Sequence, residues 1–100
     1  LGADLDIEAG YAAARQVGLT MLATLKDQID DLNQIKRLIK TLGMVNCQPD
    51  FISHPKVING FSELIQEIMG DKYGLGARSA VGMMLPSNVA VEIEAIFECY

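Results

Sequence analysis

Two residues near the carboxyl end of the chain have side chains whose types could support chemistry. Arg78 stands alone among small and apolar neighbours in a stretch that favours a β-strand, where an unpaired charge is costly. Glu92 lies on the next stretch of this kind. An arginine can bind a carboxylate through two parallel hydrogen bonds, and a glutamate can orient or activate a water molecule. We therefore predict that Arg78 and Glu92 form a small-molecule site.

These residues also have ordinary structural interpretations. Arg78 could form an ion pair with Glu94 or Glu98, and the sequence pattern by itself favours that role. Glu92 could be a solvated strand residue. Asn59, which lies on a predicted helix, could be a helix-surface or capping residue.

The residues from Ala77 to Tyr100 predict a β-hairpin whose turn is Leu85–Asn88. In the second strand apolar and acidic residues alternate, so that one face is apolar and the other carries carboxylates. The apolar set is Val89, Val91, Ile93, Ala95, Phe97 and Cys99, and the acidic set is Glu92, Glu94 and Glu98.

This hairpin would place Arg78 level with Ala95. It would place Glu92 level with Val81, three residues further along. The two candidate residues would then be offset by about 10 Å along the strands. They would not form a direct salt bridge, but they could border one cleft, with a neighbouring subunit as an alternative contributor.

Two amphipathic helices are predicted to cover the strands. The first runs from Glu8 to about Ile29, with Asp6 as its N-cap. Its apolar face comprises Tyr11, Ala14, Gly18, Met21, Leu25 and Ile29. The second begins at Ser53, its possible cap, and ends at Gly70. Its buried stripe is predicted to be Val57, Phe61, Leu64 and Ile68, with Asn59 on the opposite side.

The stretch from Gln34 to Cys47 fits a helix by one spacing and a strand by another, and its glycine and following loop favour a strand. The order is then helix, strand, helix, strand, strand, which predicts a narrow sheet covered by two helices. We find no linker or repeat, so residues 1–100 are predicted to be a single domain. Because the sequence starts at Leu1 without a methionine, we expect that it is incomplete at its front end.

The composition argues against several classes of protein. Half of the 100 residues are hydrophobic, which is typical of a globular chain. The net charge of −5 disfavours nucleic acid as a partner. Without a long apolar run or a leader, we expect a cytoplasmic protein that does not enter membranes. Cys47 and Cys99 are interpreted as buried or idle thiols, His54 as a surface residue, and no metal or cofactor is expected.

Several segments together closely resemble the Rid family, also called YjgF/YER057c/UK114 or L-PSP. The resemblance is carried at the carboxyl end by Ala77–Gly82, Leu85-Pro86 and Val91–Ile96, and in the middle by Leu42–Asn46, Asp50-Phe51 and Val57–Gly60. It extends over nearly the whole chain.

The resemblance implies a chorismate-mutase-like α+β fold, with two helices on one face of a sheet. It also implies a homotrimer whose sheets pack inward, with a cleft at each subunit interface. Archetypal members hydrolyse reactive enamines and imines, such as 2-aminoacrylate, to a 2-keto acid and ammonia. By motif, the carboxylate-binding arginine of the family falls on Arg78, its active-site glutamate on Glu92 and a cleft-lining asparagine on Asn59. The implied ligand is an imino or keto acid.

The sequence departs from the family pattern in three ways. The opening strands are absent, Ala80 stands where archetypal members have cysteine, and the chain is one residue shorter between Val81 and Leu85. We therefore carry two hypotheses beside the deaminase. One is a non-catalytic trimer that binds small carboxylates as a sensor or interaction protein. The other is an endoribonuclease, which the acidic charge disfavours.

Overall fold

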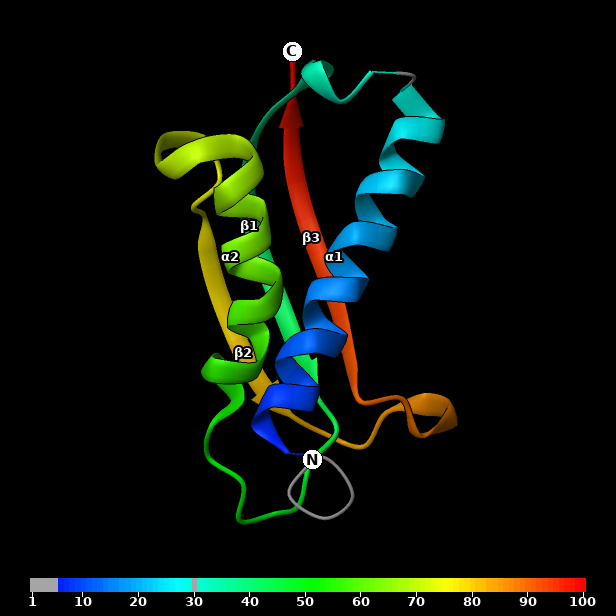
Figure 1. Cartoon of the computed structure of the whole chain (residues 1–100), viewed down its shortest axis with the longest axis vertical. Helices are drawn as coiled ribbons and strands as arrows, with labels where there is room; N and C mark the ends of the chain where they lie inside the picture. Colours follow the sequence, from blue (N-terminus) through cyan, green and yellow to red (C-terminus); the bar gives the residue numbers. More distant parts are fainter. Residues whose placement is uncertain (1–5, 30) are drawn as a thin grey trace.

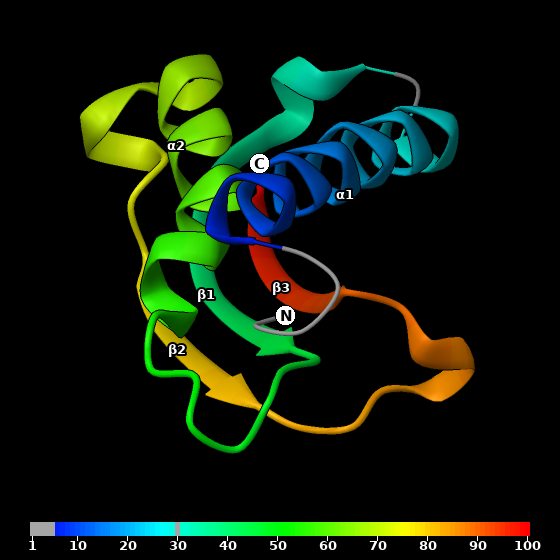
Figure 2. The same cartoon turned by 60° about the horizontal axis from the view of Figure 1, so that its bottom comes forward.

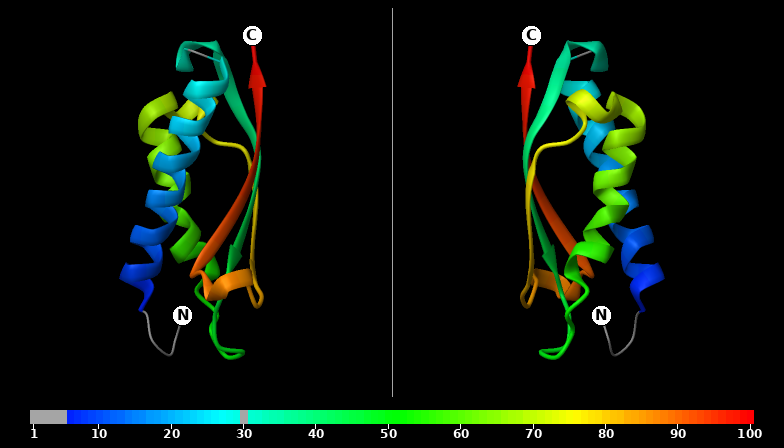
Figure 3. Two further views of the ribbon diagram at one scale, coloured as in Figure 1. Left: turned by 90° about the vertical axis from the view of Figure 1, so that its right-hand side faces the viewer. Right: turned by 90° about the vertical axis from the view of Figure 1, so that its left-hand side faces the viewer.

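The computed structural model describes residues 6–29 and 31–100. The elements follow in the order α1 (Ile7–Ile29), η1 (Leu32–Gln34), β1 (Ile35–Val45), α2 (His54–Tyr73), β2 (Ala77–Gly82), η2 (Pro86–Asn88) and β3 (Val91–Cys99). Both α-helices lie on the same face of a three-stranded sheet (Figures 1 and 3). The predicted α+β class, the predicted order of helices and strands, and the strand interpretation of the stretch after Gln34 are confirmed.

The predicted hairpin is wrong, because β1 lies between the other two strands. The sheet order is β2-β1-β3, with β1 parallel to β2 and antiparallel to β3. The segment between β2 and β3 is not a tight turn but crosses the end of β1 (Figure 2). There the backbone N–H of Met83 donates to the carbonyl of Val45, and that of Asn46 donates to the carbonyl of Ala90, each at 2.9 Å.

The predicted alignment of β2 with β3 along the strand direction is nevertheless correct. In each predicted pair of residues, a residue of β1 lies between the two partners. Thr41 pairs with Arg78 on one side and with Ala95 on the other. Met44 pairs in the same way with Val81 and Glu92. The local turn chemistry at the predicted turn is also present, since Ser87 and Asn88 have φ angles of 57° and 54°.

The alternation predicted for the last strand is confirmed from Val91 to Phe97, whereas Val89 and Cys99, which we predicted on the apolar face, are exposed. Val91 is buried, and Ile93, Ala95 and Phe97 pack against the core, while Glu92 and Glu94 are exposed. The core lies between the sheet and the helices and comprises Ala14, Leu22, Leu38, Val45, Val57, Ile58, Phe61, Ile65 and Val91. Ile68, which we predicted to be buried, is 52% exposed, whereas Ile65, one helical turn earlier, is fully buried and belongs to the core.

The two helices pack closely because small residues line their contact. On α1 the buried residues facing this contact include Gly10, Ala14 and Gly18. On α2 Gly60 is so near α1 that a Cβ atom there would lie 2.0 Å from the carbonyl oxygen of Tyr11. The contact therefore depends on glycine, whose missing side chain lets the backbones approach.

The predicted helix ends are partly confirmed. The Asp6 carboxylate accepts a 2.8 Å hydrogen bond from the backbone N–H of Ala9, as expected of an N-cap. Ser53 occupies the N-cap position of α2 without a side-chain hydrogen bond. Gly70, which we predicted to end the second helix, has a φ of 81° and interrupts α2, but one further turn follows and the helix ends at Tyr73. In the described part of the chain, no helix has the length and apolarity needed to cross a membrane.

Candidate functional site

Arg78 reaches from β2 to α2 and is held there by two neutral side chains. Its Nη1 atom donates hydrogen bonds to Oδ1 of Asn59 and, at 3.4 Å, to Oγ of Ser62. The two acceptors lie three residues apart on α2 and therefore project from the same side of the helix. The structure thus brings together Arg78 and Asn59, two of the three residues that the sequence predicted for the site.

The alternative of a structural ion pair for Arg78 is wrong. Within residues 6–29 and 31–100, no carboxylate lies within ion-pair distance of its guanidinium. Glu98 instead accepts a 2.9 Å hydrogen bond from Nε of Arg37 and lies 3.8 Å from Nζ of Lys36. The bond from Arg37 is the main reason why the pKa of Glu98 is lowered. Glu98 and Arg78 are separated by β1, because β2 and β3 form the two edges of the sheet.

An open pocket of about 460 Å³ lies beside Arg78, between α2 and the start of β2. Its lining comprises Leu38, Thr41, Asn59, Ser62, Glu63, Gln66, Gly74, Leu75, Gly76 and Arg78. The polar residues from α2 were missed by sequence reasoning, with the exception of Asn59. Their spacing of three, four and seven residues from Asn59 is that of one helix face, which is the signal that could have identified them.

Glu92 does not join this pocket within one chain. Gly43 faces α2, because a Cβ atom there would lie 2.5 Å from the side chain of Ile58. Its neighbour Met44 must point to the opposite face of the sheet, and Glu92 pairs with Met44. Arg78 points toward α2, so the two candidates lie on opposite faces. They are also offset by about 10 Å along the strands and about 10 Å across them.

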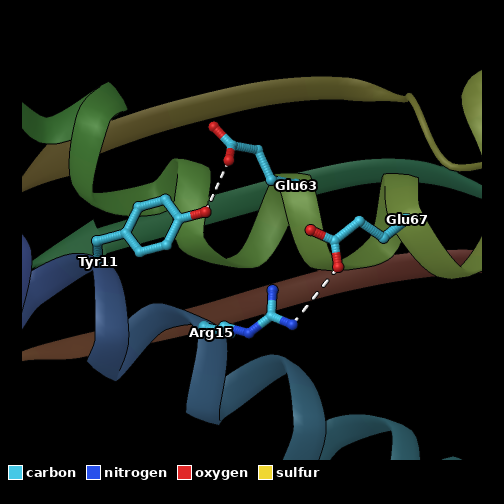
Figure 4. A network of polar contacts seen from close by, with 4 residues as sticks. All are labelled: Tyr11, Arg15, Glu63 and Glu67. Atoms are coloured by element: carbon cyan, nitrogen blue, oxygen red, sulfur yellow. Dashed lines mark hydrogen bonds and ion pairs between the residues drawn. The ribbon is translucent and has the colours of Figure 1, made fainter.

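A different carboxylate, that of Glu63, lies at the pocket beside Arg78. Figure 4 shows how it is held: the hydroxyl of Tyr11 on α1 donates a 2.6 Å hydrogen bond to Oε2 of Glu63. This bond is the main reason why the pKa of Tyr11 is raised. One turn further along, Nη2 of Arg15 lies 3.4 Å from Oε2 of Glu67 (Figure 4). The two contacts tie α1 to the side of α2 that borders the pocket.

Two helices on one face of a three-stranded mixed sheet define a protein of the YjgF/chorismate mutase-like α+β class. A family model described as "YjgF/chorismate mutase-like, putative endoribonuclease" matches residues 1–96. The chain therefore belongs to the YjgF/chorismate mutase-like family.

Three individual proteins are similar to this chain over nearly its whole length. Protein TCP17 of Trypanosoma cruzi is 39% identical over 99 residues, which are 98% of this chain and 62% of TCP17. Atu1372 of Agrobacterium tumefaciens, a solved structure of unknown function, is 41% identical and superposes on 100% of this chain with a TM-score of 0.95. A "putative endoribonuclease" from Shewanella oneidensis MR-1 is 33% identical over 97% of the chain, with a TM-score of 0.90. The chain spans 62% of the length of TCP17 and 64% of each solved chain.

Proposed function

We propose that this protein is an enamine/imine deaminase that hydrolyses 2-aminoacrylate-type intermediates to 2-keto acids and ammonia. The observation that carries the proposal is the state of Arg78. Its guanidinium lies beside an open pocket, and its partners among the described residues are two neutral groups. Since those groups do not neutralise its charge, Arg78 is available to an incoming anion.

The carboxylate of a 2-imino acid matches Arg78 in charge and in geometry. Nη1 is engaged by Asn59 and Ser62, which leaves the donors on Nη2 and Nε for the two oxygens of the ligand. The contact with α2 restricts the rotation of the guanidinium before the ligand arrives, which lowers the entropy cost of binding. Asn59 and Ser62 are also near enough to the ligand to hold its amine end or a water molecule.

Hydrolysis of the bound imine requires water to add to the carbon of the C=N bond. The C–N bond then breaks, ammonia leaves and a 2-keto acid remains. A carboxylate is needed to orient the water and transfer its protons. We assign this role to Glu92 of a neighbouring copy in a homotrimer, because Glu92 faces away from Arg78 within its own chain. Val81 and Ile96 pair with Met44 and Lys40 of β1, so they lie on the same sheet face as Glu92. Both are exposed apolar residues, which supports burial of this face against another copy.

The proposal is tested with a serine dehydratase that generates 2-aminoacrylate and with semicarbazide to trap the intermediate. The purified protein should speed the release of pyruvate, and Arg78→Ala should abolish that acceleration. Arg37→Ala is the matched control, because it removes an arginine that contacts Glu98 rather than the pocket. The deaminase assignment is withdrawn if the wild-type protein releases pyruvate no faster than Arg78→Ala.

The role of the carboxylate is tested by comparing Glu92→Gln with Glu63→Gln. Our assignment predicts that Glu92→Gln loses the reaction while Glu63→Gln retains most of it. The reverse result would place the proton-transfer role on Glu63, which lies at the pocket of the same chain.

The proposed homotrimer is tested by sedimentation of the protein, which should give the mass of a trimer.

A second candidate function is a non-catalytic trimer that binds small carboxylates. The separation of Arg78 and Glu92 within one chain supports this candidate. The arginine pocket needs no residue of β3 to bind a carboxylate, whereas hydrolysis would require the carboxylate of Glu92 as well. In this case pyruvate or 2-ketobutyrate would bind the wild-type protein and not Arg78→Ala, and 2-aminoacrylate would not be consumed faster. Endoribonuclease activity is less consistent with a net charge of −5. RNA cleavage that survives extensive repurification would support it.

A further inference from the structure

A second pocket, at the opposite end of β2 from Arg78, contains a cysteine and the histidine of the chain in contact. Sγ of Cys47 lies 3.3 Å from Nε2 of His54. Cys47 follows β1 and His54 is the first residue of α2, so the loop between them folds back to join the pair (Figure 2). His54 is therefore half-buried against Cys47. The sequence-based interpretation of His54 as a free surface residue is wrong.

The imidazole ring is confined on two sides. Phe51 meets it edge-on, with the ring centroids 5.4 Å apart and an interplanar angle of 84°. The backbone of Gly82, at the end of β2, closes the other side. A Cβ atom at Gly82 would lie 2.6 Å from Nε2 of His54 and 2.9 Å from Sγ of Cys47. A glycine at this position leaves the room that the thiol and the imidazole occupy.

The pair opens onto a pocket of about 320 Å³. Its lining comprises Cys47, Gln48, Pro49, Phe51, His54, Gly82, Met83 and Met84, and none of these residues carries a carboxylate, an ammonium or a guanidinium group. Met84 is 93% exposed, so the pocket is accessible from solvent. The pocket therefore suits a small, uncharged molecule with an apolar body.

A thiol in contact with an imidazole has the arrangement of an activated nucleophile. The imidazole can take the thiol proton, and the thiolate is the reactive form of cysteine. Cys99, the other cysteine, is exposed at the end of β3, and His54 is the only histidine in the sequence. One molecule thus contains an assisted thiol and an unassisted one, although the assisted thiol is the less exposed of the two.

We propose that Cys47 and His54 form a nucleophilic site for small, uncharged α,β-unsaturated carbonyl compounds. His54 accepts the proton of the thiol as sulfur bonds to the β-carbon, and the π electrons move toward the carbonyl oxygen. The proton then passes from His54 to the α-carbon. One C–S bond and one C–H bond form, the C=C double bond becomes single, and no leaving group or oxidant takes part. The site is separate from the arginine pocket and does not depend on the proposed deaminase activity.

The test measures the rate of adduct formation at each cysteine with methyl vinyl ketone near neutral pH. Peptide mass spectrometry resolves Cys47 from Cys99 in the same sample. We expect Cys47 to react about tenfold or more faster than Cys99 in the folded protein, and at a similar rate to Cys99 in urea. The proposal is overturned if Cys47 reacts no faster than Cys99 in the folded protein.

Two variants test the site: His54→Gln separates assistance by the imidazole from accessibility of the thiol, and Gly82→Ala fills the space that both groups occupy. His54→Gln should lower the rate at Cys47 about tenfold or more and leave the rate at Cys99 unchanged. Gly82→Ala retains both reactive residues but forces a methyl group against them, so it should also slow Cys47 selectively. Circular dichroism confirms that each variant is folded, and the rate at Cys99 is an internal check in each sample. An unchanged rate at Cys47 in a folded His54→Gln variant would refute the role of His54.

Discussion

The contact between the two helices makes a sharp prediction for the variant Gly60→Ala. The added Cβ atom would lie 2.0 Å from the carbonyl oxygen of Tyr11, 2.9 Å from the carbonyl carbon and 3.0 Å from the amide nitrogen of Arg15. All three are backbone atoms, so no side-chain rotation can relieve the contact. Since Cβ atoms essentially never approach other atoms within 3.0 Å, the helices must separate by about 1 Å.

The expected loss of stability follows from two opposing terms. Alanine in a helix is favoured over glycine by about 1 kcal/mol. Overpacking at a rigid contact costs about 3 kcal/mol, the upper part of the usual range, because the backbone of α1 must move. Gly60→Ala should therefore reduce the free energy of unfolding by about 2 kcal/mol, which corresponds to a fall in Tm of about 10 °C for a chain of this size.

Gly18→Ala is the matched control, because Gly18 lies at the same helix contact on α1. There the new Cβ atom would meet a side chain, with Cδ2 of Leu64 at 2.8 Å, rather than backbone. A side chain can move, so overpacking and helix propensity nearly cancel, and stability should change by less than about 1 kcal/mol. Urea unfolding followed by circular dichroism measures both variants. If Gly60→Ala is no more destabilising than Gly18→Ala, the close helix approach described here is wrong.

Three further predictions concern polar contacts. Arg78→Lys retains the positive charge but loses the planar guanidinium group, which can donate two parallel hydrogen bonds to a carboxylate. The Kd for pyruvate in an NMR titration should therefore rise about tenfold or more. An unchanged Kd would exclude bidentate binding. The hydrogen bond to Glu63 raises the pKa of Tyr11 above 10.0, so the stability from this bond is complete below pH 10 and is lost as the pH rises through the raised pKa. An absorbance titration should therefore contain a tyrosine ionisation step above pH 10 that disappears in Tyr11→Phe. The hydrogen bond from Arg37 lowers the pKa of Glu98 below 4.5, so the stability it contributes is present above pH 4.5 and is lost as the pH falls through the lowered pKa. The difference in urea midpoint between wild type and Glu98→Gln should accordingly shrink in acid, and a constant difference would contradict this linkage.

The sequence by itself determined the local elements and the faces that they present. The helical spacing of apolar residues predicted α1 and α2, and the alternation along β3 predicted which side chains face the core. Asp6 marked the start of α1 through side-chain capping, and Gly70 marked the interruption of α2 through its positive φ angle. These features depend on residues a few positions apart, so a short window of sequence contains the information needed to predict them.

Tertiary structure alone decided which strands are neighbours and which residues share a site. A strand can hydrogen-bond on two sides, and its own pattern does not say which strand occupies each side. The insertion of β1 between β2 and β3 therefore could not be predicted from the turn at residues 85–88. For the same reason Arg78 lies with α2 and away from Glu92, and Cys47 meets His54 across a loop. Long-range pairing of strands and packing of helices brought these side chains together. The local sequence did not determine which side chains would be their partners.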